Sequence, residues 1–179
     1  LTENTLVLFT SDHGHLFGQH GLDAKGPFHY KDMIRVPFLA RAPGKIPAST
    51  TSEALLNLVD LAPTALGWCG LNVPIWMTGL DESPVLRGEV PTLRQSTVVE
   101  NRHQPTAIHL KTLVTSRYKL TVYYRQPYGE LFDLQQDPQE RCNRWNDPAF
   151  ATLKAELIQE LLFVEMGKEV MPMPRISVA

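Results

Sequence analysis

One short apolar run constrains most strongly what this chain can fold into. Residues 5–10, with the sequence TLVLFT, are almost continuously apolar, and at residue 11 the chain turns into a polar segment rich in glycine and histidine. A short uninterrupted apolar run is typical of a strand that is covered on both faces, as in the middle of an α/β sheet. The sequence therefore predicts an α/β fold with this strand inside its sheet.

The rest of the first half fits that class. A second short strand is expected near Val36–Arg41, where Pro37 places it at an edge or puts the proline at its start. A helix is expected after Asp60, which is a plausible N-cap, with Pro63 in the first turn. The order of these elements favours an α/β layer over residues 1–95.

The second half of the chain has a different pattern of predicted elements. Several β-rich segments follow residue 95, and the alternation over 118–125 places Tyr118 and Leu120 on one face and Lys119 and Thr121 on the other. This pattern predicts an antiparallel sheet with one covered face. A helix is then expected from Pro148, capped by Asp147. Its apolar stripe, expected to pack on the sheet, comprises Phe150, Leu153, Leu157, Ile158, Leu161, Leu162 and Met166.

Composition excludes several classes of function. The 179 residues are 43% hydrophobic and 20% charged, with a net charge of -2 and no run of like charges. These values give no electrostatic reason to expect binding to nucleic acid, and no apolar stretch is long enough to span a membrane. Cys69 and Cys142 are expected to be two buried thiols rather than a disulfide. Nothing in the sequence assigns a cellular compartment.

The polar loop over residues 11–26 carries the chemistry. Asp12 and His13 come directly after the predicted strand, at the kind of strand end where α/β sheets bind ligands. A carboxylate and an imidazole are ligands for a divalent cation, whereas Lys25 is a donor suited to an anionic oxygen. Two alternatives remain open: the Asp-His-Gly is a capped turn, or His13, His15 and His20 bind zinc, although their spacing matches no short zinc motif.

The same region resembles a known family. The segment TLVLFTSDHGHLFGQHGLDAKGPFHYKDMIRVPFLARAPG is similar to the second signature region of the sulfatases, in the alkaline-phosphatase superfamily. The matching parts are a strand, Ser-Asp-His-Gly, Gly-x-His-Gly-Leu, Lys-Gly and an Arg-Val-Pro strand. Further along, LVDLAPT resembles the family's helix, and SRYKLTVYYRQPYGELFDLQQDPQE resembles its C-terminal antiparallel sheet. The resemblance covers nearly the whole chain.

The resemblance implies a role for each site residue. By position, Asp12 and His13 would be two ligands of a divalent cation, most simply Ca²⁺, and Lys25 would contact the sulfate and its leaving oxygen. His20 stands at a motif position near the substrate pocket. In the family the cation holds a formylglycine, whose hydrated form attacks the sulfur. The family's nucleophile motif, Cys/Ser-x-Pro-x-Arg, is absent here, because Cys69 is followed by GLNV and Cys142 by NRWN.

The expected architecture is therefore the C-terminal part of a sulfatase-type α/β sandwich, followed by a small antiparallel sheet packed on a C-terminal helix. Residues 1–95 would belong to the catalytic domain, with the metal loop at 11–26, and residues 96–179 would form the sheet-and-helix subdomain. The resemblance implies a sulfuric ester hydrolase acting on a small sulfated substrate. This chain alone is expected to be inactive, and an exposed sheet edge could drive self-association.

Two other functions stay open at this point. A phosphonate or phosphate ester hydrolase can share the Asp-His pair. A non-catalytic structural or interaction domain would use Asp12 and His13 only to cap a turn.

Overall fold

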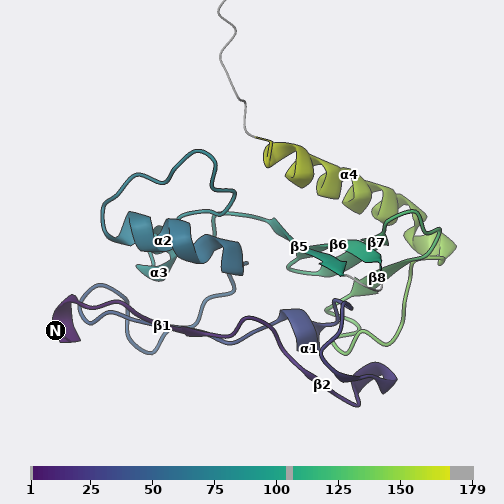
Figure 1. Ribbon diagram of the computed structural model, residues 1–179, viewed down its shortest axis with the longest axis horizontal. Coiled ribbons are helices and arrows are strands. Elements are labelled where there is room, and N and C mark those ends of the chain that lie inside the picture. The colour runs from purple at the N-terminus through teal and green to yellow at the C-terminus, as the bar shows by residue number, and fades with distance from the viewer. Residues whose placement is uncertain (1, 104–106, 170–179) are drawn as a thin grey trace, which may run out of the picture.

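The computed structural model describes residues 2–103 and 107–169. The four-stranded sheet on one side of the molecule lies between helix α4 and the segment that carries α1 and β2, whereas β1, α2 and α3 lie on the other side (Figure 1). The strands are β1 (Val7–Thr10), β2 (Leu16–Phe17), β3 (Asp23–Ala24), β4 (Phe38–Arg41), β5 (Ser96–His103), β6 (Ile108–Thr115), β7 (Tyr118–Tyr123) and β8 (Gly129–Asp133). The α-helices are α1 (Lys31–Ile34), α2 (Leu61–Trp68), α3 (Ser83–Leu86) and α4 (Ala151–Gly167). Short 3-10 helices are η1 (Thr2–Asn4), η2 (Gln19–Gly21), η3 (Leu58–Asp60) and η4 (Pro148–Phe150).

The predicted first strand forms, but only one of its faces is covered. β1 pairs with β4 in antiparallel fashion, with Phe9 opposite Leu39, and β4 begins directly after Pro37 as expected. Phe9 is 59% exposed and Leu39 is 65% exposed, so the expectation of a strand covered on both faces is wrong for this structure. The other face is partly buried, because Phe38 lies beside residues of α2 and α3.

Asp60 occupies the N-cap position of α2 but does something other than cap it. Its carboxylate accepts hydrogen bonds from the backbone N–H of Asn57 at 2.7 Å and of Leu80 at 2.8 Å. The Arg94 guanidinium also lies 2.6 Å from it. Asp60 therefore connects three chain segments. Its side chain makes no capping hydrogen bond to α2, which corrects the expectation that it caps this helix.

The four-stranded antiparallel sheet runs in the order β5-β6-β7-β8. Its apolar face packs on α4 as the alternation predicts, and Leu113, Leu120 and Leu131 are fully buried there in the main core with Leu157 and Leu161 of the helix. Full burial of one such side chain contributes about 1.5–3 kcal/mol. This contact fixes the helix on the sheet.

The opposite face of this sheet is also buried, which corrects the expectation of a single covered face. Thr112, Lys119 and Thr121 are all at most 1% exposed. The Thr112 hydroxyl lies 2.8 Å from Nδ1 of His29, and the Lys119 ammonium donates to the His29 carbonyl oxygen at 2.6 Å. The chain just before α1 therefore covers this face and satisfies its polar groups.

Helix α4 begins and packs as its local sequence predicts, except for part of the stripe. Asp147 accepts a hydrogen bond from the backbone N–H of Ala149, and Pro148 follows at the first position of η4. Ile158, Leu162 and Met166 are 41%, 55% and 57% exposed, so this part of the stripe is not buried in the contact. The predicted stripe is wider than the contact: Leu157 and Leu161 are buried in the core, and Phe150, Leu153 and Val164 are partly buried against it.

Two further expectations can be checked. Over residues 2–103 and 107–169, no helix is long and apolar enough to cross a bilayer. Cys69 and Cys142 are free and both exposed, so the expectation of buried thiols is wrong.

Candidate functional site

The loop after β1 presents the first two candidate residues side by side. The Asp12 side chain is 82% exposed and the His13 side chain 41% exposed. Oδ1 of Asp12 accepts from the backbone N–H of His13 at 3.0 Å and from the Ser11 hydroxyl at 3.2 Å. The His13 N–H and the nearby imidazole lower the pKa of Asp12 below its ordinary value, which keeps the carboxylate ionised.

The His13 ring is oriented by its own loop. Its Nδ1 atom lies 2.7 Å from the Gly14 carbonyl oxygen, and because a carbonyl can only accept, Nδ1 carries the proton in the neutral ring. The lone pair is then on Nε2, which lies 3.4 Å from Oδ2 of Asp12. Two electron-pair donors held this close, with the second ring nitrogen fixed by a backbone carbonyl, have the arrangement that metal-binding histidines adopt.

Gly14 holds this loop against α1. Its N–H donates to the Met33 carbonyl oxygen at 2.8 Å. A Cβ atom at this position would lie 1.8 Å from the carbonyl oxygen of Asp32. The loop can therefore approach α1 this closely only with glycine at position 14.

The β2–β3 hairpin separates the four predicted site residues into two groups. Leu16 pairs with Ala24, so Lys25 leaves the hairpin at the same end at which the chain from Asp12 and His13 enters it. Lys25 is exposed, and no hydrogen bond or ion pair joins it to either of those two residues in the described part of the chain. His20, by contrast, lies in η2 at the closed end of the hairpin.

Asp12 and His13 by themselves fit one side of a cation site. An ionised carboxylate and a neutral imidazole are suitable oxygen and nitrogen donors for a divalent ion. Across residues 2–103 and 107–169, no group of three or more His, Cys, Asp or Glu side chains comes together that could hold a metal by itself. The same finding argues against a zinc site built from His13, His15 and His20.

His20 belongs to a second group of residues that sequence reasoning did not find. Its ring stacks on that of Tyr30, with centroids 3.7 Å apart and an angle of 8° between the planes. Both rings line a cavity of about 360 Å³ together with Tyr123, Tyr128 and Glu130. Tyr30 and Glu130 are 100 residues apart in the chain, so no local pattern could have indicated that they meet.

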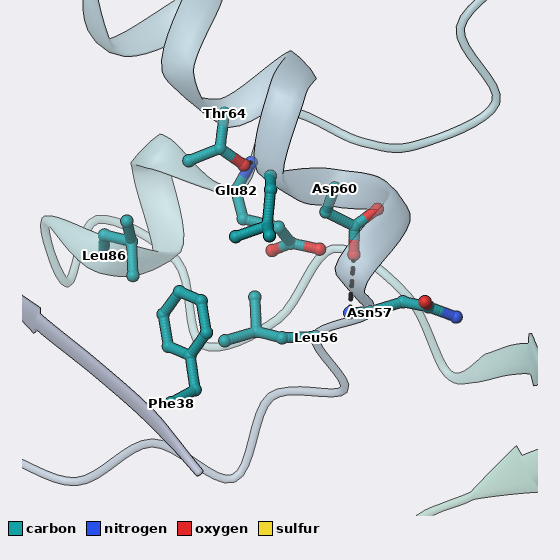
Figure 2. Close-up of a pocket in the computed structure, with 8 residues that line it drawn as sticks. Phe38, Leu56, Asn57, Asp60, Thr64, Glu82 and Leu86 are labelled. Atoms are coloured by element: carbon teal, nitrogen blue, oxygen red, sulfur yellow. Dashed lines mark hydrogen bonds between the residues drawn. The ribbon is translucent and has the colours of Figure 1, made fainter. Parts of the chain in front are cut away.

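A smaller cavity of about 10 Å³ lies between β4, α2 and α3. Figure 2 shows the Glu82 carboxylate among the residues that line it, which include Phe38 and Leu56. Both carboxylate oxygens are buried and lack a hydrogen-bond partner among the described residues, and Arg94 is 3.6 Å from Oε1. Burial raises the pKa of Glu82 to about 6. The space is too small for anything larger than one water molecule, so it is not a ligand site.

Comparison with known proteins gives the site its context. A family model described as N-sulphoglucosamine sulphohydrolase, C-terminal, matches residues 18–166. The chain is 32% identical over 166 residues to the N-acetylglucosamine-6-O-sulfatase of Bacteroides thetaiotaomicron, covering 89% of this chain and 30% of that protein. It is 31% identical over 183 residues to an ulvan-active sulfatase of Formosa agariphila, covering 94% of this chain and 34% of that protein. The chain thus spans about a third of the length of these curated relatives.

Solved structures agree with the sequence comparisons. The structure of BT4656 in complex with its substrate D-glucosamine-2-N,6-O-disulfate superposes with a TM-score of 0.86 at 30% identity, covering 93% of this chain and 35% of that one. The phosphonate monoester hydrolase of Agrobacterium radiobacter superposes with a TM-score of 0.85 at 25% identity, covering 98% of this chain and 38% of that one. These superpositions confirm the expected fold class.

Proposed function

The chain belongs to the N-sulphoglucosamine sulphohydrolase C-terminal family, and from that premise we propose that it forms the C-terminal part of a hydrolase that cleaves sulfate esters. Residues 1–95 would complete the catalytic domain and residues 96–179 would form a supporting subdomain. Sulfated saccharides are the proposed substrates, since similar proteins are named for N-acetylglucosamine and ulvan. The observation that carries the proposal is the Asp12–His13 pair, whose Oδ2 and Nε2 atoms lie 3.4 Å apart on an exposed loop.

Each site residue has a proposed task. Asp12 and His13 would bind one side of a divalent cation, with Ca²⁺ the simplest choice for a carboxylate-bearing site. Bound there, such a cation supplies positive charge that neutralises the sulfate and the charge that develops during transfer. Lys25 would hold a sulfate oxygen and stabilise the leaving oxygen from the same end of the hairpin. Further cation ligands and the formylglycine nucleophile would come from outside these 179 residues, so this chain alone should be inactive.

The experiment compares two carboxylates of one loop in the intact protein. Asp12→Asn removes a charge from the proposed cation site, and Asp23→Asn removes one from an exposed position in β3 of the same hairpin. We expect Asp12→Asn to lower kcat/KM for sulfate release from N-acetylglucosamine 6-sulfate by at least about 100-fold, as loss of an electrostatic stabiliser does. Asp23→Asn should stay within about three-fold. Undiminished activity of Asp12→Asn would instead support a turn-capping role.

A second candidate function is hydrolysis of phosphonate or phosphate esters. The superposition on a phosphonate monoester hydrolase, with a TM-score of 0.85, supports this second candidate function. The two functions separate in one assay: the intact protein is given matched aryl sulfate and aryl phosphonate esters. A kcat/KM that is at least ten-fold higher for the phosphonate would replace the sulfatase proposal.

The open face of the β1–β4 sheet supports a proposal about partners. Val7, Phe9 and Leu39 are each about half or more exposed on that face. Apolar sheet faces of this kind are normally covered. We propose that this face is covered in the working protein, by other parts of the protein or by a second copy of this chain. Light scattering of the 179-residue chain tests this, because a monomer at all concentrations up to about 1 mM would exclude the second copy.

A further inference from the structure

The cavity at the closed end of the β2–β3 hairpin is distinct from the Asp12–His13 loop. It has a volume of about 360 Å³, which is within the usual range for small-molecule sites. The residues that line it come from the β2–β3 connection, the segment before α1, β7, the β7–β8 turn and the start of β8: His20, Leu22, Phe28, Tyr30, Tyr123, Tyr128 and Glu130. Five of these seven side chains are aromatic, so the walls are mostly flat and rigid.

The polar groups of the cavity are arranged around one buried carboxylate. Glu130 is 3% exposed, and its Oε1 accepts from the hydroxyl of Tyr30 at 3.2 Å and from that of Tyr128 at 3.3 Å. Because each phenol donates a hydrogen bond to Glu130, the lone pairs of the phenol oxygen are left to accept hydrogen bonds from a ligand. Burial and the nearby Glu130 carboxylate raise the pKa of Tyr30, so the phenol stays protonated at any physiological pH.

The rings offer faces as well as hydroxyls. His20 lies exposed on the Tyr30 ring, and Tyr128 is 50% exposed with its ring 5.4 Å from that of Tyr123. A ligand that fits here presents an apolar face to an aromatic wall and donates hydrogen bonds from its edge. A ring that carries hydroxyl groups around an apolar face meets both requirements.

The Tyr30 ring and the two phenols favour an uncharged ligand over a charged one. The buried Lys119 ammonium is 5.5 Å from the centroid of the Tyr30 ring and His20 stacks on the same ring, so this ring has no free face for a further cation. Both phenols already donate to Glu130, so an anionic group finds no free hydroxyl donor there. An uncharged ligand is therefore favoured.

We propose that this cavity is a subsite for an uncharged, unsulfated sugar ring. This inference rests on the proposed function for the identity of the whole substrate, in which this ring would be joined to the sulfated one. Each strand of the hairpin is two residues long, which corresponds to roughly 7 Å between its two ends. A disaccharide or longer saccharide can span that separation, so Tyr128 and His20 would select for glycan chains over isolated sulfated monosaccharides.

The test uses the intact protein and three unsulfated disaccharides as probes: diacetylchitobiose, cellobiose and lactose. Binding is measured by calorimetric titration and by saturation transfer to the sugar protons. We expect at least one disaccharide to bind, and Tyr128→Ala to weaken its binding at least ten-fold. His20→Asn should weaken it as well, and this variant tolerates the positive φ of 55° at position 20 because asparagine readily adopts it. Two variants are made so that misfolding of one does not leave the idea untested.

The matched control is Tyr124→Ala. Tyr124 is 56% exposed, close to the exposure of Tyr128, but it contacts His109 and Arg125 outside the cavity. Disaccharide binding should stay within two-fold of the wild type. If none of the three disaccharides binds, or if Tyr128→Ala and His20→Asn bind as well as Tyr124→Ala, the subsite is disproved. If sugars bind as expected but no sulfate ester is cleaved, the proposed function fails and the sugar site stands.

Discussion

The Nζ atom of Lys119 lies 2.7 Å from Oε2 of Glu140, and the two side chains are only 2% and 1% exposed. Lys119 also donates to the His29 carbonyl oxygen at 2.6 Å, and Glu140 accepts from the Lys31 backbone N–H at 2.9 Å. One buried ion pair from the C-terminal sheet region thus holds both ends of the segment 29–31, which directly follows the candidate site loop. A substitution that breaks this ion pair should therefore also displace the loop that carries Asp12 and His13.

Breaking this pair from one side should destabilise the protein strongly. Lys119→Met leaves the Glu140 charge buried without its partner, and we expect the free energy of unfolding to fall by about 3–5 kcal/mol. The double variant Lys119→Met, Glu140→Gln should lose less than the sum of the two single changes. Urea unfolding measures all three. Arg144→Met, which breaks a partly exposed pair with Asp147, is the control and should cost at most about 1 kcal/mol; a similar small loss for Lys119→Met would contradict the argument.

The buried His29 should make the protein sensitive to acid. Burial, with a further contribution from Lys119, lowers the pKa of His29 from 6.5 to about 4. Because the unfolded chain binds this proton more readily, the stability is complete above pH 6.5 and is lost as the pH falls toward 4. The difference corresponds to about 3 kcal/mol. Unfolding curves at pH 4.5 and 7.5 should differ less for His29→Asn than for the wild type; equal differences would show that His29 is not responsible.

Glu82 should give the stability a pH dependence of the opposite sign to that of His29. Its folded-state pKa is raised from 4.5 to about 6, mainly by burial, so the stability that it contributes is present below pH 4.5 and is lost as the pH rises through 6. The loss amounts to about 2 kcal/mol. Glu82→Gln removes the titration, and at pH 8 we expect it to be more stable than the wild type by up to that amount. The exposed Glu89→Gln serves as the control, and a destabilised Glu82→Gln at pH 8 would mean that the buried charge is better satisfied than its contacts suggest.

Position 14 should tolerate no side chain. A Cβ there would lie 1.8 Å from the Asp32 carbonyl oxygen, so Gly14→Ala must move the loop that carries Asp12 and His13. We expect a loss of about 1–3 kcal/mol in the free energy of unfolding, typical of overpacking. Gly26→Ala, whose Cβ would lie 3.7 Å from Phe28, is the matched control at the end of the same loop. Equal unfolding midpoints for the two variants would rule out the close approach.

Alanine substitutions at two adjacent leucines of α4 should lower the stability by very different amounts. Leu161 is 8% exposed in the core, whereas Leu162 is 55% exposed on the outer side. Leu161→Ala should cost about 2–5 kcal/mol, as buried leucines do. Leu162→Ala should change stability by about 0.5 kcal/mol or less. Comparable losses at both positions, measured by thermal unfolding, would indicate that the outer row is covered in solution.

The local sequence pattern determined the faces of a strand, the start of the C-terminal helical segment and the Asp12–His13 pair. The alternation over 118–125 correctly predicted that Tyr118 and Leu120 face the core, because side-chain direction in a strand depends only on position. Asp147 and Pro148 predicted the start of the C-terminal helical segment for a similar reason. Asp12 and His13 are neighbours in the chain, so their proximity also needed no tertiary information.

Only the tertiary structure decided what covers each face. Period and propensity state which residues share a side of a strand, but not whether a distant segment packs there. Lys119 was expected on an open face, yet it is buried because the segment around His29, 90 residues earlier, lies on it. In the same way His20 meets Tyr30, and Tyr30 meets Glu130 across 100 residues, so the aromatic cavity exists only once the hairpin and the sheet are packed together.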